Sequence, residues 1–287
     1  MTTTERTDTA VIDAAGADRA VKAKHRAMWA SGDYPSMATE VAELGAALVA
    51  ECGVRTGDRV LDVAAGTGNA AIPAALRGAS VVASDLTPEL LDAGRRQAAW
   101  LGATLEWREA DAEALPFADG EFDTVMSAIG VMFAPQHQAS ADELLRVCRP
   151  GGTIGLACWT PEGFIGQLFA TLKPYAPTPP PGAQPPPLWG DIDHVRELLG
   201  DRVTDVSARR QTLKVGRFAD AESFREYFKA RYGPTIATYR NIANDRARTA
   251  TLDREISDLA RLAQRSDQET GRTVMEWGYL LLTARKR

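Results

Sequence analysis

The sequence predicts an α/β fold in which a doubly wound, mostly parallel sheet carries helices on both faces. Three observations predict it. Short apolar runs alternate with segments of helical periodicity. The first two runs end on acids, Asp62 and Asp85, and a glycine turn, Gly66-Thr67-Gly68, follows the first run. A glycine turn after one strand and an acid at the tip of the next are typical of a pocket for a nucleotide-like ligand.

The first half of the chain begins with a predicted amphipathic helix over residues 36–52, because apolar residues recur there at three- and four-residue spacing and Gly53 follows. Strands then alternate with helices. One helix opens near Ala70, and another begins at Pro88 with Thr87 as its cap. The strands expected in this half cover residues 59–63, 80–84, 104–108 and 122–127.

The second half is predicted to continue this alternation around an insertion. Half of the sixteen prolines lie between Pro174 and Pro187, where they deny the backbone regular hydrogen bonding. We therefore interpret residues 161–190 as an insertion over the pocket, the alternative being a surface loop without function. The other expected elements are helices over residues 139–148, 221–232 and 245–263 and strands over residues 153–159, 203–215 and 273–283.

The composition excludes several classes of function. The chain has 287 residues with 33 basic and 38 acidic side chains, a net charge of −5, and no long basic run, which disfavours a nucleic-acid partner. Residues 1–26 contain no apolar stretch long enough for a signal sequence or a membrane span, so a cytoplasmic protein is expected. The three cysteines have no metal-ligand spacing, and no metal site is predicted. The sequence leaves a homo-oligomer open.

The residues of the turn indicate which ligand the pocket holds. Gly66 and Gly68 allow backbone N–H groups to approach a ligand closely, and Asp85 can accept hydrogen bonds from two ribose hydroxyls, so adenosine is expected. The same turn also fits a dinucleotide if Ala71 takes the third glycine position. Asp62 separates the two ligands, because a carboxylate beside the turn would repel phosphates but attract an ammonium or sulfonium. S-adenosylmethionine carries both cations and no phosphate.

Four segments in order carry a family resemblance. Residues 60–69 resemble motif I of the class I S-adenosylmethionine-dependent methyltransferases, in the Ala64-Ala65 variant of the ubiquinone and menaquinone C-methyltransferase group. The other matching segments are Asp85-Leu86, Ala110-Asp111-Ala112 and residues 145–152. The resemblance implies a Rossmann-like, seven-stranded sheet whose last strand runs antiparallel between its two predecessors. It also implies S-adenosylmethionine as the cofactor and S-adenosylhomocysteine as its product.

The resemblance also assigns the cofactor-binding residues. Asp85 binds the ribose, Asp111 faces the adenine amino group, and Leu86 and Ala112 flank the ring. Ser127 contacts the cofactor from the end of the fourth strand. The turn contributes Asp62, Ala64, Gly66 and Gly68, with Ala64 in the place of the first glycine of the commonest pattern. Asp62 has an alternative role that is compatible with the first, as a buried acid that pins the turn through backbone N–H groups.

The sequence contains fewer indications of the methyl acceptor and of the residues that bind it. Methyl transfer is an in-line displacement that needs positioning and exclusion of water more than a catalytic triad. Tyr34 is predicted to fold over the cofactor, as an N-terminal aromatic does in related enzymes. Among three histidines, His137 is the best placed general base, the alternative being an exposed loop residue. The aromatic side chains that could wall an acceptor site or pack the core are Trp159, Phe164, Trp189, Phe224, Tyr227 and Phe228.

These observations predict a methyltransferase that acts on a small, partly apolar molecule of quinone or specialised metabolism. Residues 1–35 form an N-terminal segment expected to be partly mobile and able to cover the cofactor. Residues 36–287 form the methyltransferase domain, with a Pro-rich, lid-like insertion around residues 161–200. Two alternatives stay open: an NAD(P)-dependent oxidoreductase and a non-catalytic adenosylmethionine-binding protein.

Overall fold

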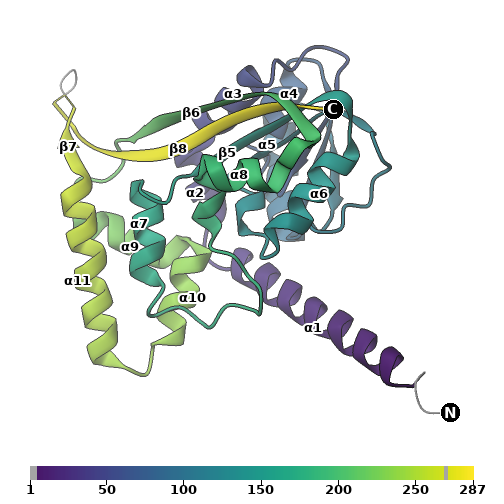
Figure 1. Cartoon of the computed structure of the whole chain (residues 1–287). Helices are drawn as coiled ribbons and strands as arrows, with labels where there is room; N and C mark the ends of the chain where they lie inside the picture. The colour runs from purple at the N-terminus through teal and green to yellow at the C-terminus, as the bar shows by residue number, and fades with distance from the viewer. Residues whose placement is uncertain (1–4, 268–270) are drawn as a thin grey trace.

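A single twisted sheet organises the computed structural model, which describes the backbone of residues 5–267 and 271–287 and the side chains of these ranges from residue 16 onward. The strand order is β3-β2-β1-β4-β5-β8-β6, and a short β7 pairs with β8 at one end (Figure 1). The strands are β1 (Arg59–Val63), β2 (Ser80–Asp85), β3 (Glu106–Glu109), β4 (Phe122–Ala128), β5 (Cys148–Trp159), β6 (Val203–Val215), β7 (Gln264–Ser266) and β8 (Thr273–Lys286).

The sheet confirms the predicted fold class. Strands β1, β2, β3, β4 and β5 pair in parallel, whereas β8 lies antiparallel between β5 and β6. Helices α3 (Ala42–Glu51), α4 (Ala71–Leu76) and α5 (Pro88–Leu101) cover one face, and α6 (His137–Val147) and α8 (Ile192–Leu199) cover the other (Figure 1). The central strands β1 and β4 are buried along most of their length, which is why their sequences lack a strict alternation of apolar and polar residues. The short β7 is an addition that the sequence pattern did not predict.

Several element boundaries differ from the prediction, and two of these differences lie near the site. The helix expected over residues 36–52 is broken at Val41 into α2 (Tyr34–Glu40) and α3. Near the break, the Asn69 side chain donates a hydrogen bond to the Ala38 carbonyl. The helix expected from residue 139 begins at His137, and β5 follows it directly at Cys148. The second difference turns the His137 side chain away from its expected loop position.

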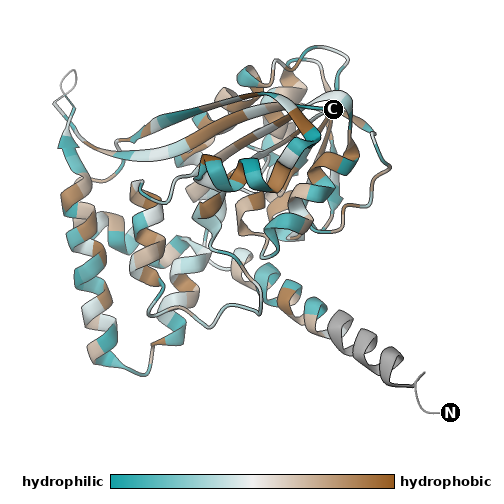
Figure 2. Ribbon diagram, viewed as in Figure 1, coloured by the Kyte–Doolittle hydropathy of each residue, from teal (hydrophilic) through white to brown (hydrophobic). Residues whose placement is uncertain are grey.

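A layer of helices lies below the sheet and is assembled from separate parts of the chain. It contains α7 (Phe164–Leu172) from the proline-rich insertion, and α9 (Ala221–Arg231), α10 (Gly233–Asn241) and α11 (Arg246–Ala263), which lie between β6 and β7 (Figure 1). Aromatic rings join this layer to β8: Phe224, Phe228, Phe218 and Phe164 all pack around Trp277. Figure 2 shows the resulting pattern, with brown strands inside the sheet and helices that are brown on one side and teal on the other.

The N-terminal segment contains a helix that the sequence pattern did not predict, α1 (Glu5–Trp29). Its C-terminal part is anchored to the end of β3 and to the loop that follows it: Arg26 pairs with Glu109, and Lys22 pairs with Asp111 and Glu113. These contacts place the end of α1 beside the carboxyl edge of the parallel strands.

The proline-rich insertion folds into more regular structure than its composition indicates. Besides α7 and α8 it contains a 3-10 helix, η2 (Pro186–Gly190), in which Trp189 is fully buried. The preceding stretch is tied to the loop before α6, where the Gln184 N–H donates to the Pro135 carbonyl at 3.1 Å. In the described part of the chain, no helix is both long and apolar enough to cross a membrane.

Candidate functional site

A cavity lies at the carboxyl ends of β1, β2, β3 and β4, where the strand order reverses direction and open α/β sheets bind their ligands. Its empty space is about 620 Å³, a volume that includes open solvent at its mouth. Its walls come from α1, from Tyr34 and from the loops that follow the four strands. The sequence-predicted residues among its lining are Tyr34, Ala64, Gly66, Asp85, Leu86, Asp111 and Ala112.

The turn after β1 has an unusual backbone. Ala64 has a φ of 53°, in the left-handed region that glycine favours, and Gly66 has a φ of 56°. Both residues line the cavity. Gly68 does not line it, and its missing side chain serves packing instead, since a Cβ there would lie 2.7 Å from the Trp107 ring. The first half of the turn therefore lines the cavity, whereas the second half packs against Trp107.

Asp85 stands at the end of β2 with its carboxylate facing the turn. One oxygen accepts a hydrogen bond from the Gly66 N–H and the other from the Thr87 N–H, each at 2.8 Å. Burial raises the pKa of Asp85, and the hydrogen bonds from the Thr87 and Gly66 N–H groups oppose that rise. A carboxylate has about four lone-pair positions, so Asp85 can still accept hydrogen bonds from a ligand after binding both backbone groups.

Asp62 is buried in the middle of the sheet and does not line the large cavity. Its Oδ2 accepts a hydrogen bond from the Ala71 N–H at 2.9 Å, which pins the start of α4 behind the turn. Its Oδ1 has no partner among the described residues, and neither does Oγ1 of Thr67. Burial raises the pKa of Asp62 to about 8 against the effect of the Ala71 hydrogen bond, and the Asp85 charge adds to the rise. Thr67 lines a second, smaller cavity of about 310 Å³ beside the turn.

The far end of the large cavity is closed by α1, which the sequence pattern did not predict. Lys22 and His25 line it together with Asp111. The Lys22 ammonium lies 3.0 Å from the nearer Asp111 oxygen. Burial opposes the charge on Lys22, but hydrogen bonds to Glu113 and Asp111 outweigh burial and raise its pKa. Asp111 also accepts a hydrogen bond from the Glu113 N–H, so its position is fixed.

Like Asp62 and Gly68, the predicted site residues Ser127 and His137 do not line the large cavity. Ser127 is fully buried and cross-links two strand ends: its hydroxyl donates to the Val63 carbonyl at 2.6 Å and accepts from the Val131 N–H at 2.8 Å. His137 is also fully buried, with its Nδ1 3.0 Å from Nε2 of His194 on α8. Burial and the neighbouring His194 lower the pKa of His137 to about 4. The structure therefore does not bring the expected general base to the site.

Tyr34, at the start of α2, lines three neighbouring cavities at once. Its ring packs edge to face against Trp29, and burial together with the Asp85 charge raises its pKa, so the hydroxyl stays protonated. The third cavity has about 350 Å³ of empty space and opens beyond Tyr34 and Ile129. Its lining combines α2, the ends of β4 and β5, α7, α9 and β8: Tyr34, Met37, Val41, Ile129, Phe133, Trp159, Ile165, Phe228, Tyr232 and Trp277.

Comparison with known proteins identifies the family. An uncharacterized protein of Mycobacterium tuberculosis (strain ATCC 25618 / H37Rv) is 55% identical over 94% of this chain and 97% of its own length. A family model described as a methyltransferase domain matches residues 60–152, the segment that forms the turn and the first strands. The chain carries a class I S-adenosylmethionine-dependent methyltransferase domain. The demethylmenaquinone methyltransferase of Clavibacter sepedonicus is 44% identical to this methyltransferase over 34% of the chain and 40% of that enzyme.

Solved structures share the fold of this methyltransferase at low sequence identity. The YcgJ protein of Bacillus subtilis has a TM-score of 0.59 at 15% identity and covers 85% of this chain and 98% of its own. A phosphoethanolamine N-methyltransferase 2 of Haemonchus contortus, in complex with S-adenosyl-L-methionine, has a TM-score of 0.51 at 17% identity, over 84% of this chain and 52% of its own. In the described ranges of this methyltransferase, no group of three or more His, Cys, Asp or Glu side chains is arranged to hold a metal ion.

Proposed function

We propose that this methyltransferase transfers the methyl group of S-adenosylmethionine to a small, partly apolar acceptor. The observation that carries the proposal is the junction at Tyr34 and Ile129. On one side of it lies a cavity at the switch point of the sheet whose lining includes the charged residues Lys22, Asp85 and Asp111. On the other side lies a cavity walled by apolar and aromatic side chains. A donor and an acceptor bound in these two spaces would meet at the junction.

The adenosine part of the cofactor fits the large cavity. Asp85 binds the two ribose hydroxyls with the lone pairs that Gly66 and Thr87 leave free. Leu86 and Ala112 flank the adenine ring, and Asp111 accepts a hydrogen bond from the adenine amino group while it remains paired with Lys22.

The methionyl part fits the turn. Two buried polar atoms there, Oδ1 of Asp62 and Oγ1 of Thr67, lack partners among the described residues, and a buried polar atom without a partner costs free energy. An ammonium group near the turn would satisfy them and would favour the ionised form of Asp62. Ala64, Gly66 and Gly68 shape the backbone of this turn, and Ser127 acts indirectly by holding the ends of β1 and β4 together.

The same turn argues against a dinucleotide cofactor. A pyrophosphate would come close to the two buried carboxyls of Asp62 and Asp85, which lie near enough to raise the pKa of Asp62. A phosphate would be repelled by the ionised form of either carboxyl, and unlike an ammonium it would leave Asp62 in its protonated form. This is the physical reason for preferring a cationic cofactor over NAD(P).

The chain's own residues contribute positioning and exclusion of water. When bound, the cofactor supplies an electrophilic methyl carbon, which an acceptor lone pair attacks as the carbon–sulfur bond breaks and its electron pair goes to sulfur. Tyr34 remains protonated and can donate a hydrogen bond at the junction. Burial and the Lys22 charge lower the pKa of His25, so the imidazole that lines the cavity is neutral at pH 7 and able to accept a proton.

Two segments cover the site in this proposal. Residues 1–35 close it through α1, whose Lys22, His25 and Trp29 line the cofactor cavity. The insertion around residues 161–200 contributes Ile165 to the acceptor cavity. Its proline-rich stretch lines none of the three cavities. It is hydrogen-bonded to the backbone of Pro135, which lines the cofactor cavity, so an effect of this stretch on the site would be transmitted through Pro135.

Isothermal titration calorimetry tests the cofactor assignment. We expect S-adenosylhomocysteine to bind in the micromolar range and NADH not to bind. Binding of NADH without S-adenosylhomocysteine would establish the oxidoreductase alternative instead. Release of S-adenosylhomocysteine from S-adenosylmethionine, dependent on an added phenol, quinone or amine, separates an enzyme from a protein that only binds the cofactor.

A further inference from the structure

We infer that the third cavity binds an uncharged aromatic acceptor and that an oxygen atom of this acceptor receives a hydrogen bond from the indole N–H of Trp277. The inference rests on the proposed function and specifies its acceptor. It follows from three features of the cavity: the absence of charge in its walls, the arrangement of its rings and one buried donor without a partner.

The first feature is the chemistry of the lining. None of the described residues that line this cavity carries a charge, and its two titratable side chains are the tyrosines Tyr34 and Tyr232. Burial raises the pKa of both phenols, so both are neutral at physiological pH. A charged acceptor entering this space would lose its hydration without gaining a counter-charge, and such burial is strongly unfavourable. The cavity therefore selects a neutral molecule.

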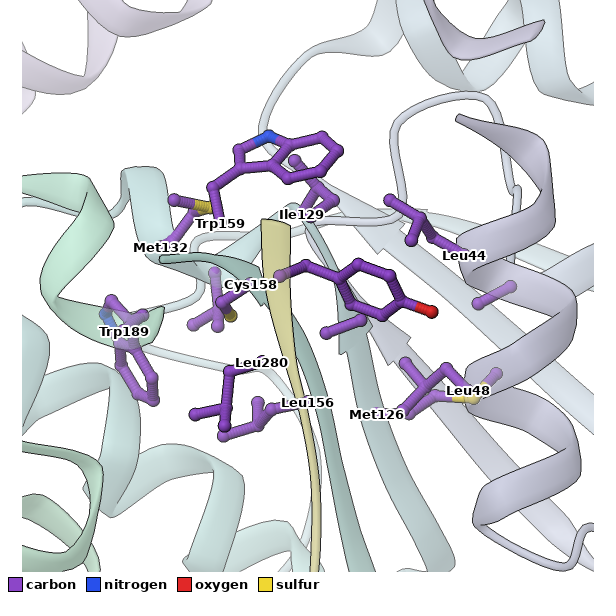
Figure 3. Packing of buried hydrophobic residues seen from close by; sticks show 14 of the residues in the cluster. Leu44, Leu48, Met126, Ile129, Met132, Leu156, Cys158, Trp159, Trp189 and Leu280 are labelled. Carbon is purple, nitrogen blue, oxygen red and sulfur yellow. The ribbon is translucent and has the colours of Figure 1, made fainter. Parts of the chain in front are cut away.

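The second feature is the arrangement of the aromatic rings. Trp159 and Trp277 meet edge to face with their centroids 5.9 Å apart, and Phe228 meets Trp277 in the same way at 5.9 Å. Figure 3 shows Trp159 next to Ile129 near the ends of the strands. Ile129 also lines the cofactor cavity. Walls that present both ring faces and ring edges favour a flat aromatic ligand, which can stack or pack edge to face against them.

The third feature is the indole N–H of Trp277. Trp277 is 1% exposed and lines the cavity, and its Nε1 has no hydrogen-bond partner among the described residues. A buried tryptophan N–H normally finds an acceptor, because leaving it unpaired costs free energy. An oxygen on the bound acceptor would supply the missing partner. This turns a nonspecific apolar cavity into one that distinguishes an oxygenated ring from a hydrocarbon.

The position of the cavity fits an acceptor rather than a structural void. Tyr34 and Ile129 line this cavity and also the cavity beside the turn, where the methionyl part of the cofactor is placed. Tyr34 and Phe133 join it to the large cavity. A ring bound between Trp277 and Tyr34 would have its opposite edge at the junction with the methyl donor.

Calorimetry with four probes tests the inference on the wild-type protein saturated with S-adenosylhomocysteine at pH 7. The probes are 1-naphthol, naphthalene, the anion 1-naphthoate and the saturated alcohol 1-decalol. We expect 1-naphthol to bind most tightly and 1-naphthoate at least tenfold more weakly. Equal or tighter binding of 1-naphthoate or 1-decalol would overturn the inference, because it would remove either the neutrality or the aromatic requirement.

A pair of matched substitutions tests the hydrogen bond. Trp277→Phe keeps an aromatic ring but removes the N–H, and Trp100→Phe makes the same change at a residue that is 84% exposed on α5. We expect Trp277→Phe to weaken 1-naphthol about threefold to tenfold and naphthalene less than twofold, and Trp100→Phe to change neither. An equal loss for both ligands would assign Trp277 a packing role only and overturn the hydrogen bond.

Binding of S-adenosylhomocysteine shows whether a negative result contradicts the acceptor inference or the proposed function. If it binds and no aromatic probe does, the acceptor inference fails while the proposed cofactor stands. If it does not bind, the proposed function fails first. Should Trp277→Phe not fold, the comparison of 1-naphthol with naphthalene on the wild-type protein still decides whether the ligand oxygen contributes to binding.

Discussion

The two halves of the site are built in different ways. The cofactor cavity is made from loops that each follow a parallel strand, and each loop contributes a polar or small residue such as Gly66, Asp85 or Asp111. The acceptor cavity is made from side chains far apart in the sequence, such as Tyr34 and Trp277, which the sheet and the helical layer bring together. Local loops are readable as a motif, whereas a wall assembled from distant elements is not.

The largest effect is expected from a substitution in the cofactor half of the site. Asp85→Ala should weaken S-adenosylhomocysteine binding about tenfold to a hundredfold, because a hydrogen bond to a charged group contributes about 1.5 to 3 kcal/mol. It also leaves the Gly66 and Thr87 N–H groups without their acceptor. Asp92→Ala, at an exposed acid on α5, is the matched control and should change nothing. Calorimetry measures both.

A variant on the acceptor side completes this comparison. Ile165→Ala enlarges the wall of the acceptor cavity and should lower stability, as large-to-small core changes do. Its affinity for S-adenosylhomocysteine should stay within about twofold of the wild type, since Ile165 does not line the cofactor cavity. A comparable loss of cofactor affinity in Ile165→Ala and Asp85→Ala would break the division into two halves.

The sheet could be predicted from sequence because its signals are local. Apolar runs, turn glycines and cap residues each act within a few positions, and together they predicted the parallel part of the sheet. The antiparallel last strand, β8, was implied by the family resemblance. Helix α1 was not predicted. Its placement depends on pairing Lys22 and Arg26 with acids at and after the end of β3, roughly 85 residues away, and no periodicity within the helix records that contact.

Asp62 should make the stability of the protein depend on pH. Its pKa in the folded protein is about 8, well above the 3.8 of a free aspartate. Between these values the folded protein keeps a proton that the unfolded chain has lost, so the stability of the empty protein falls as pH rises through this window. The slope is at most about 1.4 kcal/mol per pH unit for one group. Urea unfolding from pH 5 to pH 8 should show this fall in the wild type relative to Asp62→Asn.

Ligand binding should reverse this trend. If the cofactor ammonium stabilises the ionised carboxylate, then S-adenosylhomocysteine affinity rises with pH up to about 8 in the wild type and rises less in Asp62→Asn. Parallel stability curves for the two proteins would show that Asp62 has the same protonation state folded and unfolded. The difference between variants also removes the contribution of His137, whose lowered pKa affects both proteins equally between about pH 4 and 6.5.

His137 shows why residue type and loop position are insufficient to predict a base. A start at residue 139 would have left the imidazole in a loop at the pocket, but α6 begins at His137 and directs the side chain to His194. His25, which lines the cavity, stood in a segment expected to be partly mobile. A difference of two residues in one helix start therefore places His137 in the interior instead of at the site.

The smallest expected effect concerns the turn itself. Ala64 adopts a φ of 53°, which costs an alanine roughly 1 kcal/mol, and Ala65 beside it has no positive φ. Ala64→Gly should therefore stabilise the protein by about 0.5 to 1 kcal/mol in urea unfolding, whereas Ala65→Gly should destabilise it by a similar amount. If both glycine variants lose stability, Ala64 is not strained. If Ala64→Gly gains stability but loses cofactor affinity, the strained alanine contributes to cofactor binding. The cofactor half of the site then lowers the free energy of unfolding of the protein.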